Sequence, residues 1–105
     1  MSLTDETERR LEEAEAHIRT AMAKEFCHVM DKTGLPPMAV LRLAAQAVGS
    51  IYCEAADAHS GPRACPCGWC PHQPSDIEIL GMALVTACRM RRAEDLASTP
   101  VAGTA

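Results

Sequence analysis

Residues 65–72 have the sequence Cys65-Pro66-Cys67-Gly68-Trp69-Cys70-Pro71-His72, and they divide a chain that otherwise carries helical patterns. Proline lacks a backbone N–H and glycine is a poor helix former, so a regular helix cannot pass through this segment. The segment also holds half of the chain's 6 cysteines and its 1 tryptophan. It therefore separates two helices and concentrates the side chains that have distinctive chemistry.

Two helices are expected before this segment. Over residues 4 to about 32, apolar side chains recur at three- and four-residue steps, which makes one stripe along a helix. Its members are Leu11, Ala14, Ile18, Met22, Phe26 and Val29. Gly34 is a typical helix stop, and Pro36-Pro37 can occupy a first helical turn at no cost in hydrogen bonds. A second helix is therefore predicted from about 36 to 59, ending at Ser60-Gly61-Pro62.

A third helix is expected after the cysteine segment. Ser75 and Glu78 match the S-x-x-E capping box, which predicts a helix from about 76 to 97. No alternating strand pattern occurs. The sequence therefore predicts an all-α fold, a three-helix bundle with a cysteine-rich loop between helices two and three. Residues 1–97 would form a single helical domain and residues 98–105 a flexible tail.

Length and charge narrow the class of protein. A chain of 105 residues fits one domain, and its net charge of -4 does not suit a nucleic-acid binder, which needs a basic face. No run approaches the ~20 apolar residues that span a bilayer. The polar, acidic N-terminus does not resemble a secretory signal. We therefore expect a cytoplasmic protein, whose thiols stay reduced.

The cysteine segment has the ligand set of a zinc site with three thiolates and one imidazole. The four candidate ligands are Cys65, Cys67, Cys70 and His72. The two-residue spacing of Cys67 and Cys70 is typical of zinc knuckles, where a glycine allows a tight turn. Four ligands within eight residues would strain the loop, however. A remote ligand is therefore considered, with Cys53 and His59 the nearest candidates near the end of the second helix.

Two other interpretations of the segment stay open. Cys67 and Cys70 form a Cys-x-x-Cys pair, which can lower a thiol pKa and close a reversible disulfide. A thioredoxin-type enzyme is not expected, because that fold needs strands around the motif. Alternatively, the cysteines, prolines and Trp69 could pack as an apolar plug over one end of the helices, with no chemistry.

The second helix indicates self-association. The run Ala44-Ala45-Gln46-Ala47-Val48-Gly49 places small or apolar residues on several sides of the helix. A helix this broadly apolar is central in a bundle or packs against a second copy, so a homodimer is expected. No nucleophile elbow, phosphate loop or paired-carboxylate pattern occurs, so an enzyme is not expected.

The sequence therefore favours a small non-enzymatic helical protein with a zinc-binding loop, acting through contacts with itself or an unidentified protein. A thiol redox sensor that uses Cys67 and Cys70 is the first alternative. A helical interaction module without metal or redox chemistry is the second.

Overall fold

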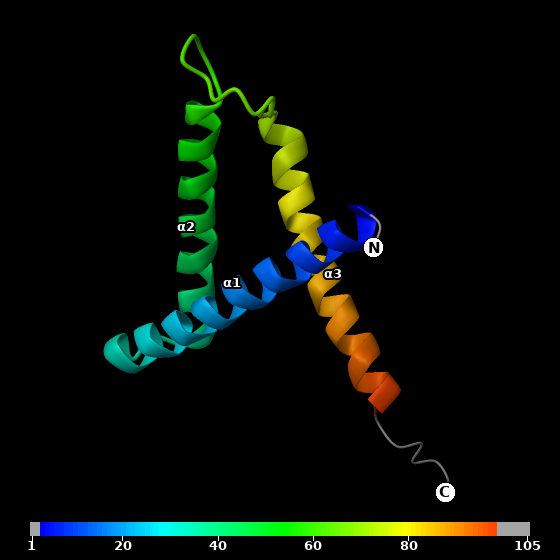
Figure 1. The fold of residues 1–105 in the computed structure, drawn as a ribbon. Helices are drawn as coiled ribbons and strands as arrows, with labels where there is room; N and C mark the ends of the chain where they lie inside the picture. The colour runs from blue at the N-terminus through cyan, green and yellow to red at the C-terminus, as the bar shows by residue number, and fades with distance from the viewer. Residues whose placement is uncertain (1–2, 99–105) are drawn as a thin grey trace, which may run out of the picture. The chain divides into compact units, whose positions relative to one another are not determined.

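The computed structural model describes residues 3–98, and residues 1–2 and 99–105 lie outside the described part. It contains three α-helices, α1 (Leu3–Thr33), α2 (Pro37–Ala58) and α3 (Gln73–Ser98), shown in Figure 1. The prediction of an all-α fold with three helices is confirmed. Ser98, the first residue of the predicted tail, is the last residue of α3, and the rest of that tail lies outside the described residues.

Helix α3 begins at Gln73, three residues earlier than the capping-box pattern predicts. The backbone N–H of His72 donates to Asp76 Oδ2 at 2.9 Å, and the N–H of Asp76 donates to the His72 carbonyl at 2.9 Å. These two bonds close the first turn. Pro74 lies inside that turn, where its missing N–H removes no helical hydrogen bond. Ser75 bonds the His72 ring and does not cap the helix.

The chain divides into two compact units, one ending at Glu54 and the other beginning at Ala55. The first unit contains α1 and most of α2. The second contains the last turn of α2, the cysteine loop and α3. Each unit is described separately below, and the prediction of a single domain stays a prediction.

In the first unit, α1 and α2 diverge from a short turn at Gly34 (Figure 1). The N–H of Gly34 donates to the Met30 carbonyl at 2.8 Å, and Gly34 has a φ of 70°. This left-handed residue ends α1 in the manner typical of a helix C-terminus. Val40 is 5% exposed and is the buried hydrophobic residue of the described chain. The unit therefore has very little core of its own.

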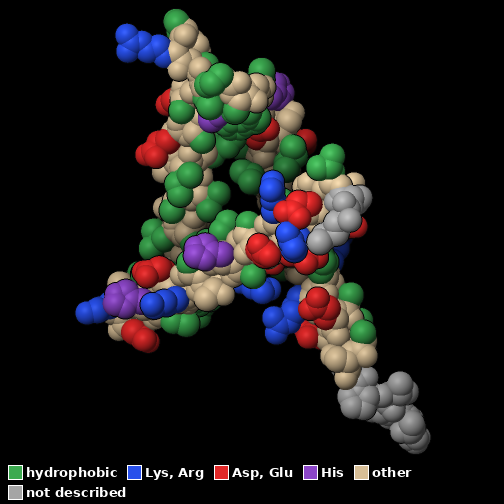
Figure 2. Space-filling view, in the orientation of Figure 1, with side chains coloured by type: hydrophobic (Ala, Val, Ile, Leu, Met, Phe, Trp, Pro, Cys, Tyr) green, Lys and Arg blue, Asp and Glu red, His purple; other side chains and the backbone are tan. Residues whose placement is uncertain are grey.

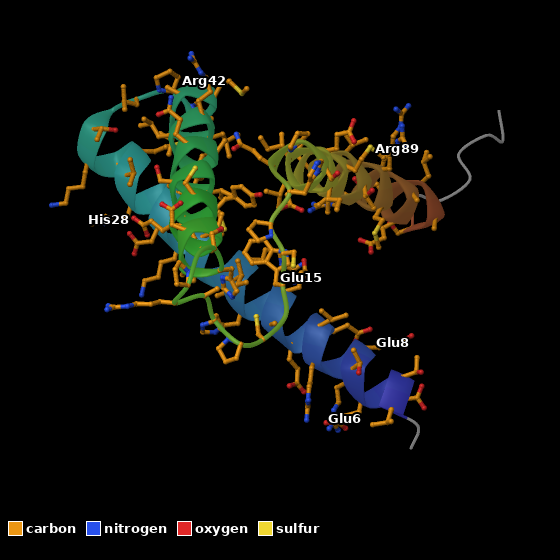
Figure 3. All side chains as sticks on the ribbon, turned by 90° about the horizontal axis from the view of Figure 1, so that it is seen from above. Glu6, Glu8, Glu15, His28, Arg42 and Arg89 are labelled. Atoms are coloured by element: carbon orange, nitrogen blue, oxygen red, sulfur yellow. The ribbon has the colours of Figure 1, made fainter. Side chains whose placement is uncertain are left out.

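The outer face of α1 is charged and solvated. Glu6 pairs with Arg9 at 2.7 Å and with Arg10 at 3.4 Å, and Glu15 pairs with Arg19 at 3.7 Å. Figure 3 labels Glu6, Glu8 and Glu15 along the N-terminal half of this helix. Exposed pairs of this kind contribute little stability, so they support the helix without fixing its packing.

Large apolar side chains remain exposed on all three helices. Figure 2 shows hydrophobic side chains over much of the visible surface. Leu11 on α1, Ile51 on α2 and Leu84 on α3, for example, are each 64–66% exposed. Within the described residues, no helix combines the length and apolar character required to cross a bilayer. Exposed apolar surface of this extent is typical of a surface that contacts another molecule.

Two glycine-to-alanine substitutions should have opposite effects on stability. Gly34→Ala should lower the free energy of unfolding by about 1–2 kcal/mol, because its φ of 70° is disfavoured for residues with a Cβ. Gly49→Ala, inside α2, should raise it by about 0.5–1 kcal/mol. Neither added methyl group meets an atom within 4 Å, so backbone preference alone decides both signs. Urea denaturation followed by circular dichroism measures the free energy of unfolding of each variant. Equal changes of the same sign for both variants would contradict this prediction.

Candidate metal centre

The last turn of α2 begins the candidate site. A helix ends with four backbone carbonyls that have no partner within the helix. Here the carbonyls of residues 55–58 each accept a hydrogen bond from the segment that follows. The donors are, in order, His59 Nδ1 at 2.7 Å, the His59 N–H at 3.1 Å, the Ser60 N–H at 3.3 Å and the Cys65 N–H at 3.0 Å. The hydrogen bonds that complete the helix thus also position two potential ligands.

The return of the chain to the helix end depends on a turn at Gly61. Gly61 has a φ of 82°, which glycine adopts without steric cost, and its carbonyl accepts from the Ala64 N–H at 3.1 Å. The following residue, Cys65, then reaches the Ala58 carbonyl. Five residues of chain therefore separate His59 from Cys65, yet both lie at the end of α2.

His59, Cys65 and Cys67 form a group that could hold a metal ion, with one ligand atom from each residue within 4.8 Å of the others. In a tetrahedral zinc site with Zn–S bonds near 2.3 Å, the ligand atoms lie about 3.8 Å apart. The group is therefore slightly wider than a loaded site. Both cysteines are exposed and His59 is half-buried, so small side-chain rotations could close it.

The hydrogen bond of the His59 ring determines which nitrogen can bind a metal. A carbonyl oxygen only accepts, so Nδ1 must carry the proton that it donates to Ala55. In the neutral ring, Nε2 then keeps a free lone pair. A carbonyl behind the ring of a histidine ligand also raises its basicity and fixes its orientation. The Trp69 ring packs edge-on against the imidazole, with centroids 4.8 Å apart, and restricts the ring further.

The same surroundings favour a thiolate at Cys67. The backbone N–H of Trp69 hydrogen-bonds the Cys67 sulfur and is the largest cause of its lowered pKa, followed by the Cys65 thiol and His59. The pKa of His59 is raised, chiefly by its bond to the Ala55 carbonyl and also by Cys67. In the predicted knuckle turn, the backbone N–H two residues after a cysteine donates to the cysteine sulfur. Gly68, with a φ of 92°, makes that turn.

The structure does not bring all the predicted ligands together. Cys70 lies outside the group, and its thiol donates to the Gly68 carbonyl at 3.7 Å. His72 also lies outside it, because its ring bonds Ser75 at 2.8 Å and its backbone starts α3. Cys53, considered as a remote ligand, is an exposed free thiol on α2 and is not a member. All six cysteines of the chain are free.

His59 is the candidate that sequence reasoning undervalued. It was considered only as a remote ligand, because it precedes the cysteine segment and belongs to the predicted second helix. The signal for it is the sequence Ser60-Gly61-Pro62, which turns the chain back immediately after His59. A turn at that position brings the residues after it toward the end of α2.

Comparison with family models, curated proteins and solved structures found no significant match for this chain. The assignment of the site therefore rests on the positions and chemistry of its own atoms.

Trp69 should report the protonation of His59, because it is the chain's 1 tryptophan and its ring touches the imidazole. In metal-free protein, Trp69 fluorescence should fall as His59 gains its proton, with a midpoint above the ~6.5 of an ordinary histidine. A raised pKa in the folded state also means that the protonated ring stabilises the fold at low pH, and that this contribution is lost as the pH rises through the folded pKa.

A fluorescence titration of chelator-treated protein measures the midpoint. His59→Gln should abolish the transition, whereas His72→Gln should leave it unchanged. A transition that survives in His59→Gln would contradict the packing of these two rings.

Proposed function

We propose that this protein is a small non-enzymatic helical protein that binds one structural zinc ion at the end of α2. His59, Cys65 and Cys67 would supply three ligands, and Cys70 would supply the fourth. The proximity of the first three ligand atoms, within 4.8 Å of one another, carries this proposal. No carboxylate belongs to the group, so its donor set is sulfur and imidazole only.

Zinc fits this donor set better than other common metals. Thiolates and imidazole are soft or borderline donors, whereas magnesium and calcium prefer oxygen ligands. The lowered pKa of Cys67 favours the thiolate form that binds metal, and the Nδ1–H bond of His59 directs Nε2 toward ligand binding. The end of a helix also carries a partial negative charge that favours a cation.

Cys70 is the best candidate for the fourth ligand. It follows Cys67 by three residues, which is the spacing of a zinc knuckle, and Gly68 already adopts the left-handed conformation of such a turn. Its thiol is exposed and makes one long bond to a carbonyl, which is easily exchanged for a metal. A closed four-ligand site is structural, whereas three ligands with an open position are typical of catalytic zinc.

The consequence of zinc binding would be an ordered loop between α2 and α3. Metal binding adds its free energy to the folded loop, because the unfolded chain lacks a preformed site. The ordered loop would in turn hold the start of α3, which begins at Gln73, three residues after Cys70. We place this protein in the cytoplasm, where reduced thiols can bind metal, and propose that it acts through contacts with another protein.

Metal content and ligand substitutions test this function. Protein purified without chelator should contain about one zinc per chain, and His59→Gln, Cys65→Ser and Cys67→Ser should each weaken binding by roughly 100-fold or more. The affinity for zinc should also decrease as the pH is lowered, because the ligands must lose their protons to bind the metal. Competition with a chromophoric chelator measures the affinities.

Matched variants distinguish the ligands from other residues of the same type. Cys53→Ser and His72→Gln should leave zinc affinity unchanged, because neither residue is one of the four proposed ligands and the His72 ring bonds Ser75. Cys70→Ser should weaken binding and remove one thiolate contribution from the charge-transfer absorption of the cobalt-substituted protein. Zinc-free protein from a metal-replete preparation would contradict the proposal.

A thiol redox role is the second candidate, favoured by the lowered pKa of Cys67. In chelator-treated protein near neutral pH, Cys67 should react with iodoacetamide several-fold faster than Cys53, because its lowered pKa favours the reactive thiolate. Mass spectrometry of the alkylated peptides measures both rates within one sample. After mild oxidation, a reversible Cys67–Cys70 disulfide would support the redox role, whereas equal alkylation rates would contradict it.

A further inference from the structure

The first unit carries an apolar groove that is separate from the candidate metal centre. The groove has a volume of about 560 Å³ and lies between α1 and α2. Its lining residues are Ile18, Met22, Glu25, Phe26, Val29, Val40, Leu43, Ala44, Ala47, Val48 and Ile51. Apart from Glu25, every one of these side chains is apolar. None of the proposed zinc ligands contributes to it.

The chemistry of the groove fits an apolar protein surface better than a small molecule. Binding sites for small molecules combine apolar walls with a few polar groups that orient the ligand. Here the one polar group is the Glu25 carboxylate, which would repel an anionic ligand such as a fatty acid. The helical spacing of the lining on both walls, with steps of three and four residues, matches what another helix face presents.

The exposed apolar area is close to what one partner of a dimer buries. The lining residues Ile18, Met22, Leu43, Val48 and Ile51 are each between 40 and 64% exposed. Leu11 continues the α1 stripe two turns beyond Ile18 and is 65% exposed. Together these side chains expose roughly 400 Å² of apolar area to solvent. This value multiplies each exposed fraction by the apolar area of an aliphatic side chain. A standard interface buries about 800 Å² per partner, slightly more than half of it apolar.

The walls of the groove differ in a way that suits self-association. The α1 wall carries bulky residues such as Met22 and Phe26, whereas the α2 wall includes the small residues Ala44 and Ala47. Under a two-fold axis, the bulky wall of one copy faces the small wall of the other, and side chains interdigitate.

Helix α3 carries apolar residues on two opposite faces, Ile77 and Leu84 on one and Ile79 and Met90 on the other, all exposed. If one face of α3 met another helix of the same chain, its opposite face would still require a partner.

We propose that the α1–α2 groove binds the same groove of a second copy, forming a two-fold symmetric homodimer whose core combines four helices. The interface would be isologous, so each lining residue would contribute to it once from each copy. Its formation does not depend on zinc, because the groove contains no metal ligand.

Analytical ultracentrifugation of the full chain tests this proposal. Wild-type protein should sediment at twice the 11.3 kDa mass of the chain, with or without chelator. Ala47→Glu would place two carboxylates in the interface of each dimer and should raise the dissociation constant by about tenfold or more. Gln46→Glu adds the same charge at the neighbouring position, outside the groove lining, and should leave the dimer intact.

Circular dichroism verifies that each variant keeps its helices. If Ala47→Glu loses helicity, Met22→Gln is tested in its place, because glutamine is similar in length to methionine but polar. Weaker association of a variant that keeps normal helicity would support the proposal. A monomeric wild type would overturn it, since the groove would then be covered by α3 of the same chain or by another ligand. Equal dissociation constants for the groove and control variants would also overturn it.

Discussion

The hydrogen bonds at the end of α2 are the constraint on which the candidate metal centre depends. Four carbonyls that the helix leaves unpaired are all satisfied by the next seven residues. One of these bonds fixes the His59 tautomer, and another holds Cys65 against the helix end. Local backbone pairing, which any helix must achieve at its C-terminus, thus also sets the spacing between an imidazole and a thiol. No long-range packing is needed to bring these residues together.

The short loop after Cys65 completes the arrangement through similarly local effects. Gly68 turns the chain, so that the Trp69 amide reaches the Cys67 sulfur and the Trp69 ring reaches His59. The amide favours the thiolate, and the ring restricts the imidazole. Because these contacts lie within one compact unit, the site can form whatever happens at the α1–α2 groove. The proposed metal binding and the proposed self-association would therefore be separable.

The first unit illustrates the opposite situation, in which local structure is complete but packing is not. Helix α1 ends at a suitable glycine, Gly34, yet Val40 is the buried hydrophobic residue of this unit. Two helices enclose little volume, so most of the apolar stripe on each remains in contact with solvent. The free energy that would stabilise this unit has to come from a further surface, which connects its stability to association.

The sequence alone determined the number of helices, the absence of strand patterns and the position of the loop, because periodicity, glycine and proline act locally. It also placed candidate metal ligands in residues 65–72. Only the tertiary structure decided the membership of the ligand group. His72 matches the spacing of a ligand, but its ring and backbone are used in starting α3. His59 lies outside the motif, but the turn at Gly61 returns Cys65 to it. Spacing along a chain cannot distinguish these outcomes, because the direction of a loop depends on which backbone groups still require a hydrogen-bond partner.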